Sequence, residues 1–182
     1  LSRKAAEASL TWLKPDSALL PLRPDRKVLV IEQLRPIEFI TNDIHFHAHR
    51  FNEAMLRHSR NLLNADCSFV ADGQERDFLT ELSAQADIIV MTNFYWRIVA
   101  SANQALVRTL AATGKPVVVV TNDPYEAGAP VEASAVLCTF STMPESLEAA
   151  AACLYGKLDA TGRLPVSNAA CSASGASPTH KQ

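Results

Sequence analysis

The chain lacks the glycine-rich loops with which many α/β proteins bind phosphate groups. Only six of its 182 residues are glycine, and neither G-x-G-x-x-G nor G-x-x-x-x-G-K-[ST] occurs. The turn after the first predicted strand reads Glu32-Gln33-Leu34-Arg35-Pro36. Because this turn has no glycine, its backbone could not approach a phosphate closely. We therefore predict that the chain binds no dinucleotide, and we expect no cofactor.

An excess of charge of one sign is also lacking. The formal net charge is −2, with 17 basic and 19 acidic side chains, so the sequence predicts no binding to nucleic acid or to an anionic membrane. The longest apolar runs are far shorter than the roughly 20 residues that a membrane-spanning helix needs. No signal peptide opens the chain, which slightly favours a cytoplasmic location. The first residue is Leu1 rather than Met, as expected for a fragment of a longer protein.

Cysteine pairs close in sequence are absent. The four cysteines, Cys67, Cys138, Cys153 and Cys171, form no C-x-x-C pair, which argues against a zinc ribbon or a thioredoxin-like site. The first three fall in predicted strands or helices, where a small apolar thiol is common. We therefore favour buried free thiols over disulfides.

Three histidines, His45, His47 and His49, form an H-x-H-x-H run. On a strand all three imidazoles would share one face and could bind a metal, whereas on a helix His47 points away from the other two. Apolar residues recur at helical spacing through this region, namely Ile44, Ala48, Phe51, Met55 and Leu62. We therefore predict a helix with a solvated or interdomain histidine face and no metal site.

Predicted strands and helices alternate along the chain. Strands are predicted at 27–32, 67–71, 87–91, 116–121 and 135–140, and a brief one at 164–166. Helices are predicted at 2–13, across the histidine region, and around 78–82, 106–111 and 147–154. This order predicts an α/β fold, a three-layer α/β/α sandwich with a mostly parallel sheet of five to six strands. We divide the chain into an interdomain helix and linker (1–24), the sandwich domain (25–167) and a mobile tail (168–182).

Several positions make this prediction specific. Four consecutive valines at 117–120 indicate a central parallel strand that is buried on both faces. Gly114 is placed to end the preceding helix with a positive φ. Phe78, Leu79 and Leu82 are predicted to face inward. Two pairs have the spacing of capping boxes, Asp72 with Glu75 and Thr142 with Glu145.

Ligand contacts in an open α/β sheet come from loops at the carboxyl ends of the strands. Four residues in such loops are our candidates for substrate contact: Asn93, Asn122, Asp123 and Tyr125. Asp123, with Glu126 nearby, can also be interpreted as a simple polar turn. No G-x-S-x-G elbow occurs, and we assign no catalytic residue.

Three segments resemble the second, C-terminal domain of family 3 glycoside hydrolases. The most informative is residues 154–167, which read Leu-Tyr-Gly-Lys-Leu-Asp-Ala-Thr-Gly-Arg-Leu-Pro-Val-Ser. The opening helix followed by Leu19-Leu20-Pro21-Leu22 resembles that family's interdomain junction. Gly114-Lys115-Pro116 with the four valines resembles its central strand. The resemblance covers nearly the whole chain and implies an accessory domain that accompanies a catalytic barrel.

Within that family the chain is similar to the β-N-acetylhexosaminidase branch. Glucosidase-like members carry a general-acid glutamate in the loop after the third strand, but residues 92–99 contain no carboxylate. Residues 139–141 and 146–151 also resemble the hexosaminidase form. The family's nucleophilic aspartate and its Lys-His-Phe-Pro-Gly-His type of motif are missing, and no (β/α)8 barrel fits in this chain.

The resemblance implies that the N-terminal (β/α)8 barrel of the same parent protein is the partner and binds the glycan. The parent would hydrolyse terminal N-acetylglucosamine with retention of configuration, and this chain alone would be inactive. Two alternatives stay open, because this architecture hosts many functions. One is a stand-alone sugar-binding or protein-interaction module without catalysis, and the other is an unrelated flavodoxin-like regulatory domain.

Overall fold

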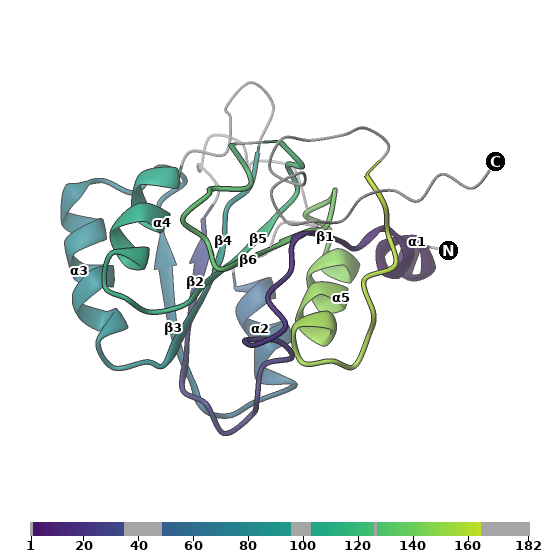
Figure 1. Cartoon of the computed structure of the whole chain (residues 1–182), viewed down its shortest axis with the longest axis horizontal. Helices are drawn as coiled ribbons and strands as arrows, with labels where there is room; N and C mark the ends of the chain where they lie inside the picture. The colour runs from purple at the N-terminus through teal and green to yellow at the C-terminus, as the bar shows by residue number, and fades with distance from the viewer. Residues whose placement is uncertain (1, 35–48, 96–102, 126, 165–182) are drawn as a thin grey trace.

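The computed structural model describes residues 2–34, 49–95, 103–125 and 127–164. They form a six-stranded sheet with helices on both faces (Figure 1). The strands are β1 (Thr11–Lys14), β2 (Val28–Gln33), β3 (Leu62–Cys67), β4 (Ile88–Thr92), β5 (Val117–Thr121) and β6 (Ala135–Cys138). Their order across the sheet is β1-β6-β5-β4-β2-β3. All neighbouring pairs are parallel except β1 with β6.

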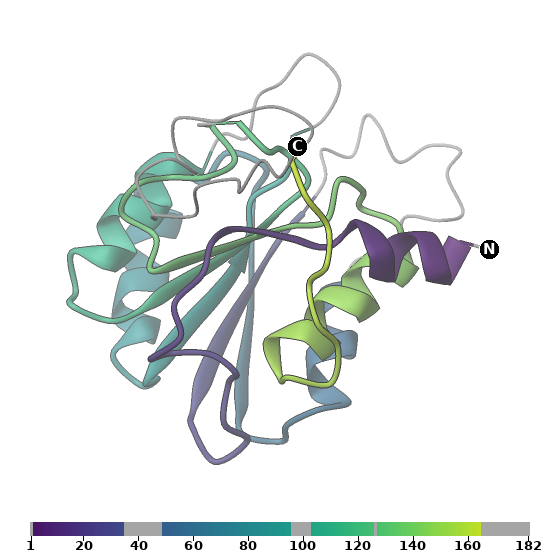
Figure 2. The same cartoon turned by 45° about the vertical axis from the view of Figure 1, so that its right-hand side comes forward.

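In the described ranges, five helices cover the sheet. On one face α1 (Ser2–Ser9) and α2 (Arg50–Leu56) both pack against α5 (Pro144–Leu154), and on the other α3 (Gly73–Ser83) packs against α4 (Gln104–Ala111). Figure 2 shows the two groups on opposite sides of the sheet. The predicted three-layer sandwich is therefore confirmed. No helix in the described ranges has the length and apolar character to cross a membrane.

The valine strand divides its side chains between the two cores. Val118 and Val120 belong to the cluster under α2 and α5, whereas Val117 and Val119 belong to the cluster under α3 and α4. All four are fully buried, and β5 lies between β4 and β6. A strand covered on both faces has no reason to alternate apolar with polar residues, so the prediction of a central parallel strand is confirmed.

The beginning of the chain differs from the prediction of one helix over 2–13. The helix ends at Ser9, and Thr11–Lys14 forms β1 at the edge of the sheet. Leu10 and Leu13 are buried, and β1 pairs with β6. The free edge of β6 offers backbone hydrogen bonds and an apolar surface to this segment. That tertiary interaction outweighs the helical spacing of residues 5–12.

The region between β2 and α3 also differs. The predicted strand at 67–71 is wrong, because β3 covers Leu62–Cys67 and Leu62 is not helical. The helix of this region is confirmed only over Arg50–Leu56, and Ile44 and Ala48 lie outside the described residues. β3 is the edge strand opposite β1 and is only partly buried, so it tolerates Asn64 and Asp66. These two polar residues obscured the strand in the sequence.

Predicted helix ends are confirmed in part. The Asp72–Glu75 capping box is present at α3, and Gly114 has φ 79° after α4. The second capping box is wrong, because Met143 is the N-cap residue of α5 and makes no side-chain cap.

Two further positions differ from prediction. Phe78 on α3 is 60% exposed rather than inward-facing. The sixth strand is β1 rather than residues 164–166, since Leu164 is not in a strand and the next two residues lie outside the described ranges.

The three cysteines that the structure describes are buried and free, as predicted. Burial raises the pKa of Cys67 and Cys138 to about 12 and that of Cys153 to about 11. Their thiols are therefore protonated at neutral pH and are not nucleophiles. Cys171 lies outside the described residues.

Candidate functional site

Five strands end at one edge of the sheet. Because β2 to β6 are parallel, their loops lie along the same side, at the top of Figure 1. We call the described residues of these loops the carboxyl edge: 34, 68–72, 93–95, 103, 122–125, 127–129 and 139–143. All four predicted contact residues lie on it, as their positions after strands predict.

A buried carboxamide, Gln33, joins two loops of the carboxyl edge. Its Nε2 donates to the carbonyl oxygen of Phe69 at 2.7 Å, and its Oε1 accepts from the N–H of Phe94 at 2.6 Å. The backbone N–H of Gln33 donates to Oγ1 of Thr92 at 2.8 Å. The end of β2 therefore holds the loops that follow β3 and β4.

Asn103 fixes the loop after β3 from the other side. Its Oδ1 accepts from the N–H of Ala71 at 2.9 Å, and its Nδ2 donates to the carbonyl oxygens of Phe69 and Ser68 at 3.1 and 3.3 Å. Asn103 is the N-cap residue of α4, but its side chain does not cap that helix. It is only 1% exposed, so these bonds are shielded from water.

The candidate Asn93 belongs to the same buried network. Its Oδ1 accepts from the backbone N–H of Asn103 at 3.3 Å, and its Nδ2 donates to the carbonyl oxygen of Ala127 at 3.1 Å. The side chain is fully buried. In this arrangement Asn93 organises the loops, and direct contact with a substrate stays a prediction.

Asn122, Asp123 and Tyr125 have different surroundings. Asn122 is bonded to the backbone of Tyr95 in both directions, at 2.7 Å through Oδ1 and 3.0 Å through Nδ2. Asp123 is buried, and its Oδ1 accepts from the N–H of Tyr125 at 3.0 Å. Tyr125 is 64% exposed. Tyr125 is therefore the most accessible of the four, and substrate contact by these residues also stays a prediction.

The loop after β5 folds back on itself at Gly128. A Cβ atom there would lie 2.1 Å from the carbonyl oxygen of Asp123 and 2.6 Å from Oγ1 of Thr121. Only glycine allows this approach, because real Cβ atoms do not come so close to backbone oxygen. Glu126 lies outside the described residues.

A buried carboxylate, Glu32, holds the start of α2. Its two oxygens accept from the N–H groups of Phe51 and Asn52 at 3.2 and 2.9 Å. These are the second and third residues of the helix, so Glu32 supplies the cap that His49, the N-cap residue, does not. Burial raises the pKa of Glu32, although both hydrogen bonds oppose the shift. In the sequence, Glu32 lies at the end of a predicted strand, and nothing there indicates that it caps a helix.

The histidine run yields one described residue. His49 has a left-handed backbone, with φ 67°, and its Nδ1 lies 3.2 Å from Oδ1 of Asp66. His45 and His47 lie outside the described residues. Over residues 2–34, 49–95, 103–125 and 127–164, no three acidic, histidine or cysteine side chains come together in a way that could hold a metal.

Exposed apolar side chains gather on the carboxyl edge. Five of the seven large apolar residues that the structure gives as exposed lie there, from four loops: Val70, Tyr95, Tyr125, Phe140 and Met143. Phe140 also has φ 54°, an uncommon conformation for an aromatic residue. An exposed apolar set on one face is typical of an interaction surface.

Comparison with known proteins identifies the family. The model of the glycosyl hydrolase family 3 C-terminal domain matches residues 10–180. The chain belongs to this family. The predicted resemblance is thereby confirmed. No curated protein matches the chain.

Several solved structures have the same fold. A β-N-acetylglucosaminidase from Paenibacillus sp. str. FPU-7 is 18% identical, with a TM-score of 0.75 over 90% of this chain and 31% of its own. The β-glucosidase from Listeria innocua, 15% identical, has a TM-score of 0.70 over 85% of this chain and 25% of its own. A fungal multi-domain β-N-acetylglucosaminidase, 18% identical, has a TM-score of 0.66 over 92% of this chain and 19% of its own. The family 3 domain described here thus spans about a third or less of these proteins.

Proposed function

We propose that this family 3 domain is the accessory C-terminal domain of a β-N-acetylhexosaminidase, and that the catalytic barrel lies outside this chain. Domains of this family normally belong to proteins with an N-terminal catalytic domain. In this proposal the barrel binds and cleaves the glycan, and the carboxyl edge packs against the barrel. The observation that carries the proposal is the set of exposed apolar side chains on that edge.

The chemistry of the edge supports an accessory role. Retaining glycosidases use two carboxyl groups about 5 Å apart. Of the described carboxylates at the strand ends, Glu32 binds the start of α2 and Asp123 accepts a hydrogen bond within its own turn. Asp66, beside Glu32 on β3, lies 3.2 Å from Nδ1 of His49. Each of these three carboxylates therefore has a partner within the domain.

The hexosaminidase branch is favoured by the loop after β4. In glucosidase-like members this loop carries the general acid, whereas here it begins with Asn93, Phe94 and Tyr95 and residues 92–99 contain no carboxylate. Two of the similar structures are β-N-acetylglucosaminidases, and another is a β-glucosidase. An acid supplied by the barrel would explain why this loop needs none.

Hydrolysis by the full-length parent protein tests the branch. We expect it to cleave an aryl N-acetyl-β-glucosaminide at least tenfold faster than the matching aryl β-glucoside, and the isolated chain to cleave neither. Preference for the glucoside would contradict the hexosaminidase assignment. Turnover by rigorously purified isolated chain would contradict the accessory role.

The role of the edge is tested by two matched variants of the parent. Tyr125 and Phe78 are similarly exposed aromatic residues, on the carboxyl edge and on α3 respectively. Tyr125→Ser is expected to lower kcat/KM by about tenfold, the loss typical of a side chain that anchors an interface. Phe78→Ser should leave kcat/KM unchanged. Equal effects of the two substitutions would show that the edge is not the packing surface.

A further inference from the structure

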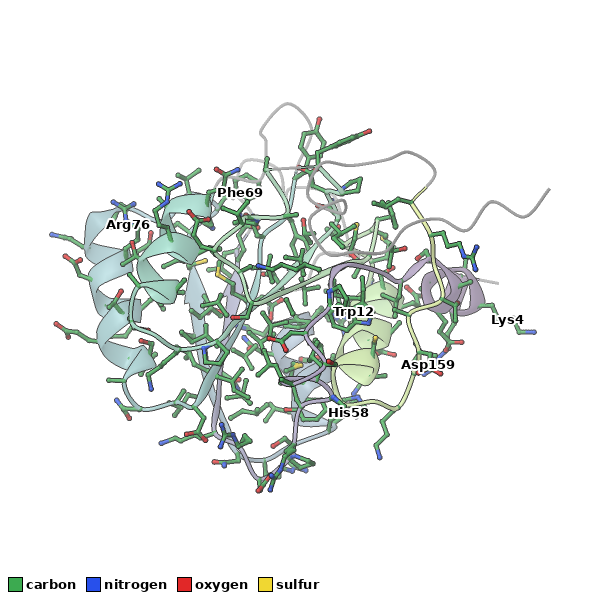
Figure 3. The ribbon with its side chains drawn as sticks, viewed as in Figure 1. Lys4, Trp12, His58, Phe69, Arg76 and Asp159 are labelled. Carbon is green, nitrogen blue, oxygen red and sulfur yellow. The ribbon has the colours of Figure 1, made fainter. Side chains whose placement is uncertain are left out.

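A cavity of about 240 Å³ lies outside the carboxyl edge, between β1 with its following loop and the segment after α5. Trp12 and Asp159, one from each side, are labelled in Figure 3. The remaining lining residues are Pro15, Asp16, Ser17, Leu20, Pro21, Cys153, Gly156, Leu158 and Ala160. None of them belongs to the set of residues proposed to face the barrel, so the cavity is a separate feature of the domain.

Hydrogen bonds fix the two sides of the cavity relative to each other. The N–H of Leu22 donates to the carbonyl oxygen of Leu154 at 2.7 Å, and the N–H of Gly162 donates to that of Leu10 at 2.8 Å. At the base, a Cβ on Gly156 would come within 2.9 Å of Cβ of Pro21. The cavity is therefore bounded by backbone that is held in place on both sides.

The residues that line the cavity include one tryptophan, Trp12, and two acidic residues, Asp16 and Asp159. Oδ1 of Asp16 accepts from the N–H groups of Ala18 and Leu19 at 3.0 and 3.2 Å, which fixes the orientation of that carboxyl group. Asp159 is exposed and makes no hydrogen bond or ion pair to the described part of the chain. Burial and, next, the charge of Asp159 raise the pKa of Cys153 to about 11, so the negative field of Asp159 extends to Cys153.

Positive charge is missing from the same lining. None of the eleven residues that line the cavity is lysine, arginine or histidine. The remaining walls are mainly proline, leucine and alanine. An aromatic ring attracts a cation over its face, and apolar walls suit the carbon atoms next to it. The two acidic residues of the lining, Asp16 and Asp159, also favour a cation.

We propose that this cavity binds a small ligand that carries an alkylammonium group, with Trp12 and Asp159 as the principal contacts. The proposal does not depend on the proposed enzymatic role. The volume is below the roughly 300 Å³ at which pockets for drug-sized ligands begin, so the ligand is small. Because Asp159 is exposed to solvent, the affinity is modest, with a Kd on the order of 1 mM.

Fluorescence of Trp12 measures the binding directly. The chain has two tryptophans, so Trp96→Phe leaves Trp12 as the single reporter. Choline is the probe, and 3,3-dimethylbutan-1-ol is its neutral counterpart of nearly the same shape. We expect saturable quenching by choline and at least fivefold weaker binding of the neutral alcohol. Raising the salt concentration should weaken choline binding, because salt screens exposed charges.

A matched pair of variants assigns the response to the cavity. Asp159→Asn should weaken choline binding about fivefold, while Asp77→Asn, at an exposed position on α3, should leave it unchanged. Equal binding of choline and the neutral alcohol would overturn the proposal, as would an unaltered Kd in Asp159→Asn. Tighter binding of N-acetylglucosamine than of choline would identify a sugar site instead. Absence of saturable quenching would also refute it.

Discussion

Removing the side chain of Asn103 tests whether buried carboxamides hold the carboxyl edge together. Asn103→Ala leaves the N–H of Ala71 without its acceptor. The carbonyl oxygen of Phe69 still accepts a hydrogen bond from Nε2 of Gln33. Ser68 is exposed, so water can replace Nδ2 of Asn103 as the donor to its carbonyl oxygen. One orphaned buried donor costs about 1–3 kcal/mol, and each further lost hydrogen bond about 1 kcal/mol net. We therefore expect a loss of about 2–4 kcal/mol in the free energy of unfolding.

The measurement is urea unfolding followed by circular dichroism, together with the melting temperature. For a domain of this size the predicted loss lowers Tm by roughly 5–15 °C. Asn61→Ala is the control, because Asn61 is exposed and its Nδ2 makes one hydrogen bond, to the carbonyl oxygen of Asp25. That variant should change stability by less than about 0.5 kcal/mol. Similar losses in both variants would refute the reasoning that burial makes the Asn103 bonds decisive.

Other substitutions probe charge, glycine geometry and the central strand. Burial raises the pKa of Glu32, so its contribution to stability is complete below the unfolded pKa and is lost as pH rises through the folded pKa. Glu32→Gln should therefore gain stability relative to wild type as pH rises from about 4 to 7. If the Tm of the variant and that of wild type changed with pH in the same way, this expectation would be wrong. Gly128→Ala should lower the free energy of unfolding by more than Gly114→Ala does. A Cβ atom at Gly114 would contact no other atom, so that substitution carries only the cost of a left-handed backbone, roughly 1–2 kcal/mol. Equal losses would argue against the tight turn. Val118→Asp should unfold the domain, because it buries an unpaired carboxylate, and an unchanged Tm would show that β5 is not central. We also expect chelators to leave Tm unchanged, and stoichiometric zinc in untagged protein would contradict that.

The fold could be predicted because most elements carry their own local pattern. The valines at 117–120, the capping box at Asp72 and the glycine after α4 each depend on neighbours in sequence, and each is confirmed. β1 could not be predicted in this way. Thr11 pairs with Cys138, 127 residues away, and nothing in residues 11–14 records that contact. A short apolar segment adopts the structure that its tertiary surroundings favour.

The positions of the candidate site followed from topology, but the roles of its residues did not. A polar residue after a strand is predicted to face a ligand, and Asn93, Asn122 and Asp123 are polar. The structure gives all three side chains partners within the chain. Gln33 and Asn103 were missed because a glutamine ending an apolar run and an asparagine before a helix resemble an ordinary boundary and cap. Spacing cannot distinguish a cap from a bond to another loop.

The carboxyl edge thus has a fixed interior and an apolar exterior. Buried amides set the positions of the loops, whereas Tyr95, Tyr125 and Phe140 point their apolar area outward. In the described ranges two non-glycine residues have positive φ: Phe140, which lies on this edge, and His49, which precedes α2. Such conformations cost energy and persist where the surrounding structure enforces them. A surface that combines rigid loops, backbone strain and exposed aromatic rings is poorly explained by stability of the isolated domain. Packing against a second domain would use all three features.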